Sequence, residues 1–151
     1  WFDSPSTFLG MFVHGFPNML MPAGPQSGSA SPNYPRGIET GVNWCTELLK
    51  YMWERDLVRA DATPEAEHAW TSEVERMYSR MLMRKAKSWF TGYNSNVPGH
   101  EQGRIRYFVY NGGSPKYVVK LNECAGNDYE GVDFVSASDM ARAGQPDRIA
   151  G

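Results

Sequence analysis

The residues best placed to do chemistry lie where an apolar run gives way to a helix. The run at 19–23 is followed by Gly24-Pro25, by a loop of small residues at 26–32, and by Asn33-Tyr34-Pro35, where a helix is predicted to begin. The first N–H groups of a helix lack partners within it and carry partial positive charge. This junction therefore predicts a site for a phosphate or for the electron-rich carbonyl edge of a ring cofactor.

Other catalytic patterns are absent from the sequence. The histidines, His14, His68 and His100, are far apart, and none has metal-ligand spacing to a Cys, Asp or Glu. We expect His14 to be a satisfied core residue in a short strand and His68 to be solvated, while contact of His100 with a cofactor or substrate stays open. The acidic residues are spread over predicted helix surfaces, so no carboxylate pair stands out. The chain also lacks a G-x-G-x-x-G or Walker A phosphate-binding motif.

Composition limits the partners. The 151 residues carry a net charge of −2 at pH 7, so electrostatics give no reason to expect nucleic acid or an anionic membrane as a partner. No apolar run approaches the roughly 20 residues of a membrane span, and no signal peptide is apparent, so we expect a cytoplasmic protein without a membrane partner. Cys45 falls on a predicted apolar helix face, which favours buried free thiols at Cys45 and Cys124 over a disulfide.

The candidate site must be positioned by short strands at 11–14 and 19–23 and by a helix at 33–54. Pro35 suits the first turn of this helix, and Ser31 or Asn33 could cap it. Its apolar face is predicted from positions three or four apart, namely Ile38, Val42, Cys45, Leu49 and Met52. Gly37 and Gly41 lie one turn apart, which is compatible either with close helix–sheet packing or with a ligand against the backbone.

The rest of the chain predicts two more helices. After an extended piece at 57–60, Thr63 caps a helix that starts with Pro64, and its buried stripe is Ala66, Trp70, Val74, Met77 and Met81. Residues 89–103 read as a long loop, 104–110 as a strand, 115–124 as a helix and 129–135 as a last strand. The polar, small residues at 137–151 predict a disordered tail.

Three motifs, in order, resemble the C-terminal portion of flavin-dependent Baeyer–Villiger monooxygenases. They are Asn18-Met19-Leu20-Met21-Pro22-Ala23-Gly24-Pro25, then Lys87-Ser88-Trp89-Phe90-Thr91-Gly92-Tyr93-Asn94, and last Tyr110-Asn111-Gly112-Gly113 with Tyr117 and Tyr129-Glu130-Gly131-Val132. Val118 stands where the family usually has a basic residue. The resemblance covers residues 7–136 and implies an α/β fold, α+β as an isolated fragment, from a Rossmann-like flavoprotein with two dinucleotide-binding domains.

The resemblance also implies a division of the chain and its site residues. Residues 1–56 would be the end of the FAD-binding domain, with its last strand, a loop and a helix. Residues 57–136 would form a helical lid segment that contains an NADP loop at 88–103. Residues 137–151 would be the tail. The implied cofactor-binding residues are Gly24, Pro25, Asn33, Tyr34 and Trp89, and the implied substrate-pocket residues are Ser29, Ala30, Ser31, Pro32 and Tyr34. Without the resemblance, this loop would be an ordinary connector and Trp89 a core anchor.

The implied activity is the insertion of one oxygen atom next to a ketone carbonyl, with FAD, NADPH and O2. No catalytic side chain and no metal ligand is assigned here, because the family's glycine motifs, signature sequence and catalytic Arg belong upstream. The start at Trp1 instead of Met favours a fragment, although processing would look the same. The expected partner is the N-terminal remainder of the enzyme, against an apolar interface of Trp1, Phe2, Phe8, Phe12 and Phe16. The rival is a free-standing, non-catalytic α+β interaction module that keeps the motifs for packing.

Overall fold

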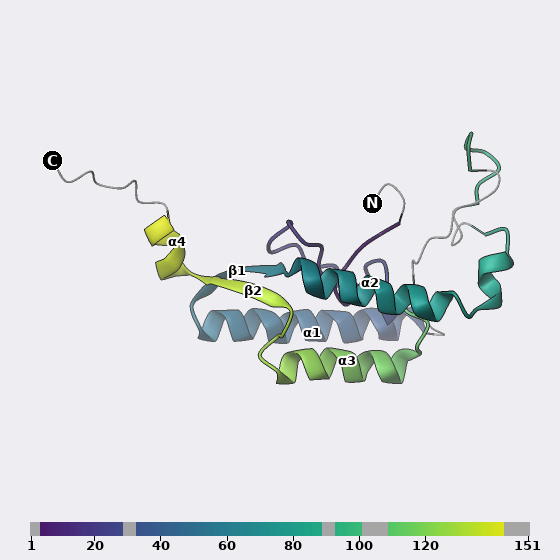
Figure 1. Cartoon of the computed structure of the whole chain (residues 1–151). Helices are drawn as coiled ribbons and strands as arrows, with labels where there is room; N and C mark the ends of the chain where they lie inside the picture. Colours follow the sequence, from purple (N-terminus) through teal and green to yellow (C-terminus); the bar gives the residue numbers. More distant parts are fainter. Residues whose placement is uncertain (1–3, 29–32, 89–92, 101–108, 144–151) are drawn as a thin grey trace.

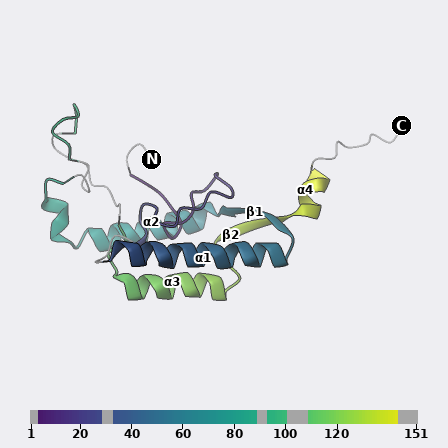
Figure 2. The ribbon, with the colours of Figure 1, turned by 180° about the vertical axis from the view of Figure 1, so that it is seen from behind.

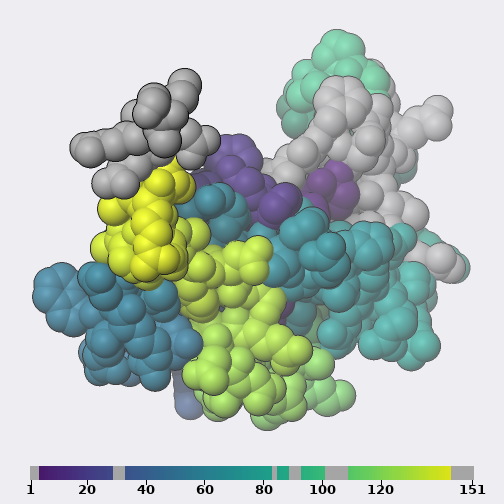
Figure 3. All heavy atoms as spheres, turned by 60° about the vertical axis from the view of Figure 1, so that its left-hand side comes forward, coloured from purple at the N-terminus to yellow at the C-terminus, as the bar shows by residue number. Residues whose placement is uncertain are grey.

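Helices arranged side by side dominate the structure, a computed structural model that describes residues 4–28, 33–88, 93–100 and 109–143. The elements are α1 (Tyr34–Glu54), β1 (Leu57–Ala62), α2 (Pro64–Tyr78), the 3-10 helix η2 (Leu82–Lys85), α3 (Ser114–Gly126), β2 (Val132–Ser136) and α4 (Ala137–Ala143). Helix α3 runs alongside α1, and α2 extends onward from the end of the β1–β2 ribbon in both ribbon views (Figures 1 and 2). The turn after α3 and β2 lie between the C-terminal end of α1 and α2 (Figure 3).

Helix α1 begins as predicted and buries Cys45 and Met52 as predicted, but its buried face is rotated toward Trp44 and Leu48. The Asn33 side chain caps it by accepting a hydrogen bond from the Arg36 N–H at 3.2 Å. The buried residues of α1 are Gly41, Trp44, Cys45, Leu48 and Met52, so the prediction is wrong for Val42 and for Leu49, which is 55 % exposed. The large Trp44 ring decides the rotation, because its Nε1–H donates to the Leu121 carbonyl of α3 at 2.9 Å.

The strands predicted before α1 are not formed. Residues 11–14 and 19–23 are turns and irregular backbone. A strand needs a neighbour along its length, whereas here Phe8 and Phe12 make an isolated bridge within one tight turn, and Met21 donates a single hydrogen bond to the Met11 carbonyl. Met11 and Phe12 are fully buried, so the side chains of this segment fill part of the hydrophobic core. The predicted apolar interface is therefore wrong for Phe8 and Phe12.

Strand β1 and helix α2 follow the prediction closely. Thr63 caps α2 by accepting a hydrogen bond from the Ala66 N–H at 3.1 Å, and Pro64 occupies the first turn. Trp70 and Val74 are buried as expected, and Tyr78 joins them where the sequence did not indicate it. β1 pairs antiparallel with β2, which places Ala62 opposite Val132.

The C-terminal part contains one correction. Helix α3 and strand β2 match the predicted helix and strand to within a few residues. Residues Ala137–Ala143, however, form helix α4, so the expectation of a disordered tail is wrong for them. Ser136 explains the helix, because its hydroxyl accepts a hydrogen bond from the Asp139 N–H at 3.1 Å and thereby caps the first turn. The strand predicted at 104–110 falls mostly outside the described residues. Among those that are described, no helix is long and apolar enough to span a membrane.

Candidate functional site

A groove of about 530 Å³ lies where α1 and α3 both begin, and we call it the helix-start groove. One wall consists of Gly28, Asn33, Arg36, Gly37 and Thr40, and the other consists of Gly113, Ser114, Pro115, Tyr117 and Val118. No carboxylate belongs to this lining, and the positively charged Arg36 is its one charged side chain. Two helix N-termini and a guanidinium make the groove electropositive, as the sequence predicted for the start of α1.

Most of the N–H donors at the start of α1 are already engaged. The Arg36 N–H donates to the Asn33 side chain, the Gly37 N–H donates to the Asn33 carbonyl, and Pro35 has no N–H. Within the described part of the chain the Tyr34 N–H has no acceptor. A phosphate cradle uses several convergent N–H groups. The start of α1 by itself therefore offers one free N–H to a ligand, and the two ligands that the sequence left open stay predictions.

Tyr117 forms a rigid wall of the helix-start groove. Its hydroxyl donates to the Leu9 carbonyl at 2.6 Å, and its ring lies so close to Gly28 that a Cβ there would come within 2.5 Å of it. Burial raises the pKa of the Tyr117 hydroxyl, while a backbone hydrogen bond from Gly28 acts in the opposite direction. Tyr117 therefore stays a neutral donor and does not act as a base at neutral pH.

The predicted site residues are only partly brought together. Asn33 lines the groove, and the Tyr34 side chain is 51 % exposed. Gly24 packs closely on the Gly10 carbonyl, and the Pro25 carbonyl accepts a hydrogen bond from Thr7, so this pair contacts the N-terminal segment instead of the groove lining. The remaining predicted residues, Ser29, Ala30, Ser31, Pro32 and Trp89, lie outside the described residues.

The two glycines of α1 have different roles. Gly37 lines the helix-start groove, which is compatible with a ligand close to the backbone. Gly41 packs on residue Pro22, whose carbonyl oxygen would lie 2.0 Å from a Cβ at this position. Close packing therefore explains why a glycine stands at position 41, but the neighbour is the irregular backbone at Pro22 and not the expected sheet.

Gln26 anchors the loop that leads into the groove, a role that no motif in the sequence indicated. Its side chain is fully buried. The amide Nε2 donates to the Pro5 carbonyl at 2.7 Å, and Oε1 accepts hydrogen bonds from Thr7 at 2.8 Å and Thr71 at 3.2 Å. This network ties the loop to the N-terminal segment and to α2, since a buried amide is retained where each polar atom has a partner.

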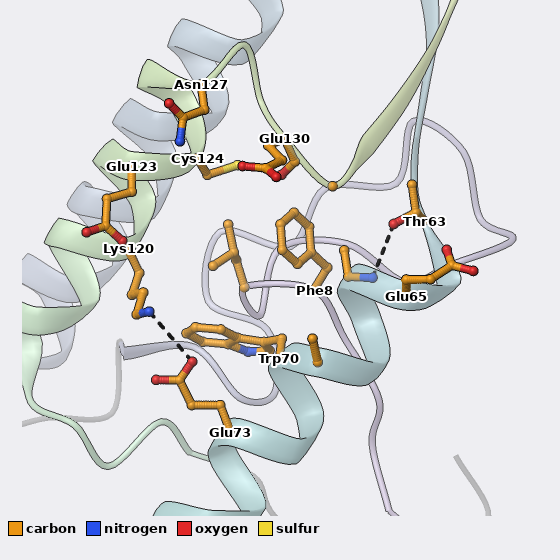
Figure 4. Close-up of a pocket in the computed structure, with 14 residues that line it drawn as sticks. Phe8, Thr63, Glu65, Trp70, Glu73, Lys120, Glu123, Cys124, Asn127 and Glu130 are labelled. Carbon is orange, nitrogen blue, oxygen red and sulfur yellow. Dashed lines mark hydrogen bonds and ion pairs between the residues drawn. The ribbon is translucent and has the colours of Figure 1, made fainter.

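A second, larger groove of about 800 Å³ runs between α2 and α3 (Figure 4), and we call it the α2–α3 groove. Its floor includes Phe8, Leu9 and Trp70. Its rim carries four glutamates, Glu65, Glu73, Glu123 and Glu130. The sequence did not indicate this acidic rim, because the turn between α3 and β2 brings together residues that are far apart along the chain.

The remaining reactive side chains are not arranged for catalysis. Burial raises the pKa of the Cys45 thiol to about 11, and burial, followed by the charge of Glu130, raises that of Cys124 to about 12. Both cysteines are free and buried, as predicted. The His14 side chain is exposed, not buried, and its Nδ1 pairs with the Ala62 carbonyl at 2.7 Å. Within the described residues no group of three potential ligands could hold a metal ion.

Comparison with known proteins finds relatives over most of this chain, although no family model matches it. A phenazine N-monooxygenase of Lysobacter antibioticus is 40 % identical over 92 % of this chain and 24 % of its own length. Cyclohexanone 1,2-monooxygenase of Acinetobacter is 33 % identical over 89 % of this chain and 23 % of its length. The chain is homologous to Baeyer–Villiger and related FAD-binding monooxygenases. It spans about a quarter of the length of these relatives.

Solved structures of the monooxygenase family agree with this assignment. Cyclohexanone monooxygenase of Rhodococcus sp. Phi1 bound to NADP+ superimposes with a TM-score of 0.78 at 30 % identity, over 91 % of this chain and 24 % of that enzyme. OTEMO in complex with FAD and NADP gives a TM-score of 0.78 at 29 % identity. The predicted α/β fold, as a segment of a flavoprotein with two dinucleotide-binding domains, and the predicted cofactors of such enzymes, FAD and NADP, are confirmed. The division into domains and the site residues stay predictions.

Proposed function

We propose that this chain is the C-terminal portion of an FAD- and NADPH-dependent monooxygenase that inserts one oxygen atom next to a ketone carbonyl. The observation that carries the proposal is homology to such monooxygenases over about nine-tenths of the chain. The helix-start groove adds physical support, because it offers a free N–H and a positive helix end to an electron-rich ring edge.

In this proposal the start of α1 faces the carbonyl edge of the isoalloxazine. Bound FAD would supply the oxygen chemistry, with electrons from NADPH. The Tyr34 N–H and the α1 dipole would stabilise negative charge at the ring edge, while Tyr117 and Gly28 fix the opposite wall. The loop at 29–32 and Tyr34 would line the ketone pocket, and Trp89 would contact the nicotinamide side of NADP. The chain by itself would be inactive.

The rest of the enzyme would cover the outer face of α1. Val42, Leu49 and Trp53 are spaced seven and four residues apart, so they lie on one face of α1. All three are exposed, and Trp53 is 87 % exposed. Apolar side chains gathered on one exposed helix face are typical of an interface. Of the aromatics expected at this interface, Phe16 is 58 % exposed and stays a candidate, Phe8 and Phe12 are buried, and Trp1 and Phe2 lie outside the described residues.

A second candidate reaction is the oxygenation of a nitrogen atom in a heteroaromatic substrate. Sequence identity favours it, because this chain is 40 % identical to the phenazine N-monooxygenase and 33 % identical to the cyclohexanone enzyme. Both classes use the same proposed flavin position, so the helix-start groove does not distinguish them.

A pair of hybrid enzymes tests the proposal. In each hybrid, this chain replaces the matching quarter of the Lysobacter phenazine enzyme or of the Acinetobacter cyclohexanone enzyme. We expect yellow, flavin-loaded proteins that oxidise NADPH. Each hybrid is then given cyclohexanone and phenazine, and a shift toward one substrate relative to the parent enzyme identifies the class that this chain favours.

The Trp89→Ala variant of the hybrid tests the nicotinamide contact. Weaker use of NADPH with flavin retained supports it, and unchanged NADPH kinetics remove Trp89 from the site. Hybrids that fold but stay colourless contradict the flavin role and favour the non-catalytic module.

A further inference from the structure

The α2–α3 groove differs from ordinary protein surface in its charge. Four glutamates line it, and one of them, Glu73, is paired with the lining residue Lys120 at 3.8 Å. The other three, Glu65, Glu123 and Glu130, are exposed and have no ion pair in the described part of the chain. Three uncompensated carboxylates around one groove create a negative potential that attracts a cationic partner.

The floor of the groove is apolar and belongs to the hydrophobic core. Phe8, Leu9 and Trp70 are all buried, and the small side chains of Ala66 and Ala69 widen the groove on the α2 side. Figure 4 shows Phe8 and Trp70 between the glutamates of the two helices. An aliphatic stem or an aromatic ring can rest on such a floor while a charged head reaches the rim, as arginine and lysine side chains do.

The carboxylates are spread along the groove instead of converging on one point. Glu65 lies in the first turn of α2, Glu73 two turns further, Glu123 in α3 and Glu130 in the turn after it. No three of them could share a metal ion within the described residues. An elongated partner with several cationic groups fits this spacing better than a single ion does.

Trp70 supplies an observation that does not depend on charge. Its side chain is only 4 % exposed, yet its indole Nε1–H has no hydrogen-bond partner in the described part of the chain. An unpaired buried donor is unfavourable because it has lost its hydrogen bond to water. Since the Trp70 ring lines the groove, its indole N–H reports on an occupant that packs against the ring.

We infer that the α2–α3 groove docks a basic polypeptide segment whose arginine or lysine residues alternate with apolar residues. The apolar residues pack on Phe8, Leu9 and Trp70, and the cationic residues pair with Glu65, Glu123 and Glu130. This site is separate from the helix-start groove, so it holds whether or not the chain serves a flavoenzyme.

Peptide binding to the 151-residue chain tests the inference. The probe is a capped pentapeptide of three arginines alternating with two leucines, titrated by calorimetry at low salt. The test variant is Glu65→Gln/Glu123→Gln/Glu130→Gln, and the matched control is Glu39→Gln/Glu47→Gln/Glu54→Gln on α1, which changes the net charge equally. All six side chains are exposed, so both variants should fold.

We expect the test variant to weaken binding by at least about tenfold, because three ion pairs of roughly 0.5 kcal/mol each are lost. The control should stay within about twofold, and a probe with serines in place of leucines should bind more weakly. Shifts of the Trp70 indole N–H signal in NMR spectra should accompany binding. Equal losses in both variants, equal binding of the serine probe, or an unperturbed indole signal would overturn the inference.

Discussion

The two grooves are linked by one hydrogen bond but are built in different ways. Tyr117 of the helix-start groove donates its hydroxyl proton to the carbonyl of Leu9, which lines the α2–α3 groove. The helix-start groove is electropositive, and its lining combines glycines and the exposed cap Asn33 with the buried Tyr117 ring. The α2–α3 groove is acidic and has core side chains as its floor.

This difference has a consequence for mutation. Lining made of main chain and exposed caps can change at low cost in stability, whereas lining shared with the core cannot. The exposed cap Asn33 of the helix-start groove can therefore change at low cost, whereas its Tyr117 wall is held by the core. The α2–α3 groove can alter its rim charges freely, but its floor is fixed by packing.

The largest effect is expected when the floor of the α2–α3 groove is removed. Trp70→Ala should lower the free energy of unfolding by about 3–5 kcal/mol, since it opens a cavity beside Tyr110, whose ring stacks on Trp70 with centroids 5.0 Å apart. Urea denaturation followed by circular dichroism measures this loss. The matched control, Trp53→Ala on the exposed face of α1, should change stability by less than about 0.5 kcal/mol. Similar losses in both variants would show that this floor is not part of the core.

A smaller effect is expected at Tyr117, whose hydroxyl links the two grooves. Tyr117→Phe keeps the ring but leaves the buried Leu9 carbonyl without its donor, so the free energy of unfolding should fall by about 1–2 kcal/mol. Tyr34→Phe, at an exposed ring, is the control and should be neutral within the error of denaturation. A neutral Tyr117→Phe would mean that the two grooves are not coupled through this hydrogen bond.

The smallest effect is expected at the cap of the helix-start groove. Asn33→Ala should cost about 1 kcal/mol, because the Arg36 N–H loses its acceptor. Thr63→Ala removes the equivalent cap of α2 and should cost a similar amount, which makes it a matched comparison in the same denaturation assay. A loss at Asn33 as large as that of Trp70→Ala would break the distinction between an exposed cap and a floor fixed by packing.

Local signals in the sequence predicted the helices well. Asn33 and Thr63 cap α1 and α2 as expected, because a cap bonds to an amide only a few residues away. The early strands failed because a strand depends on a neighbour elsewhere in the chain, and the segment at 8–13 turned on itself and filled the core instead. The buried face of α1 was misjudged for a related reason, since Trp44 finds its hydrogen-bond partner in α3.

The candidate site shows the same division. The positive end of α1 follows from the order of residues around Asn33, and the motifs indicated the resemblance to flavoprotein monooxygenases. The sequence alone therefore predicted α1, α2 and α3, that resemblance, and a positive helix start at Asn33 as a candidate site. The tertiary structure decided the wall at Tyr117, the buried Gln26 network and the acidic α2–α3 groove, because each joins residues from separate segments whose distances are set only when the core packs.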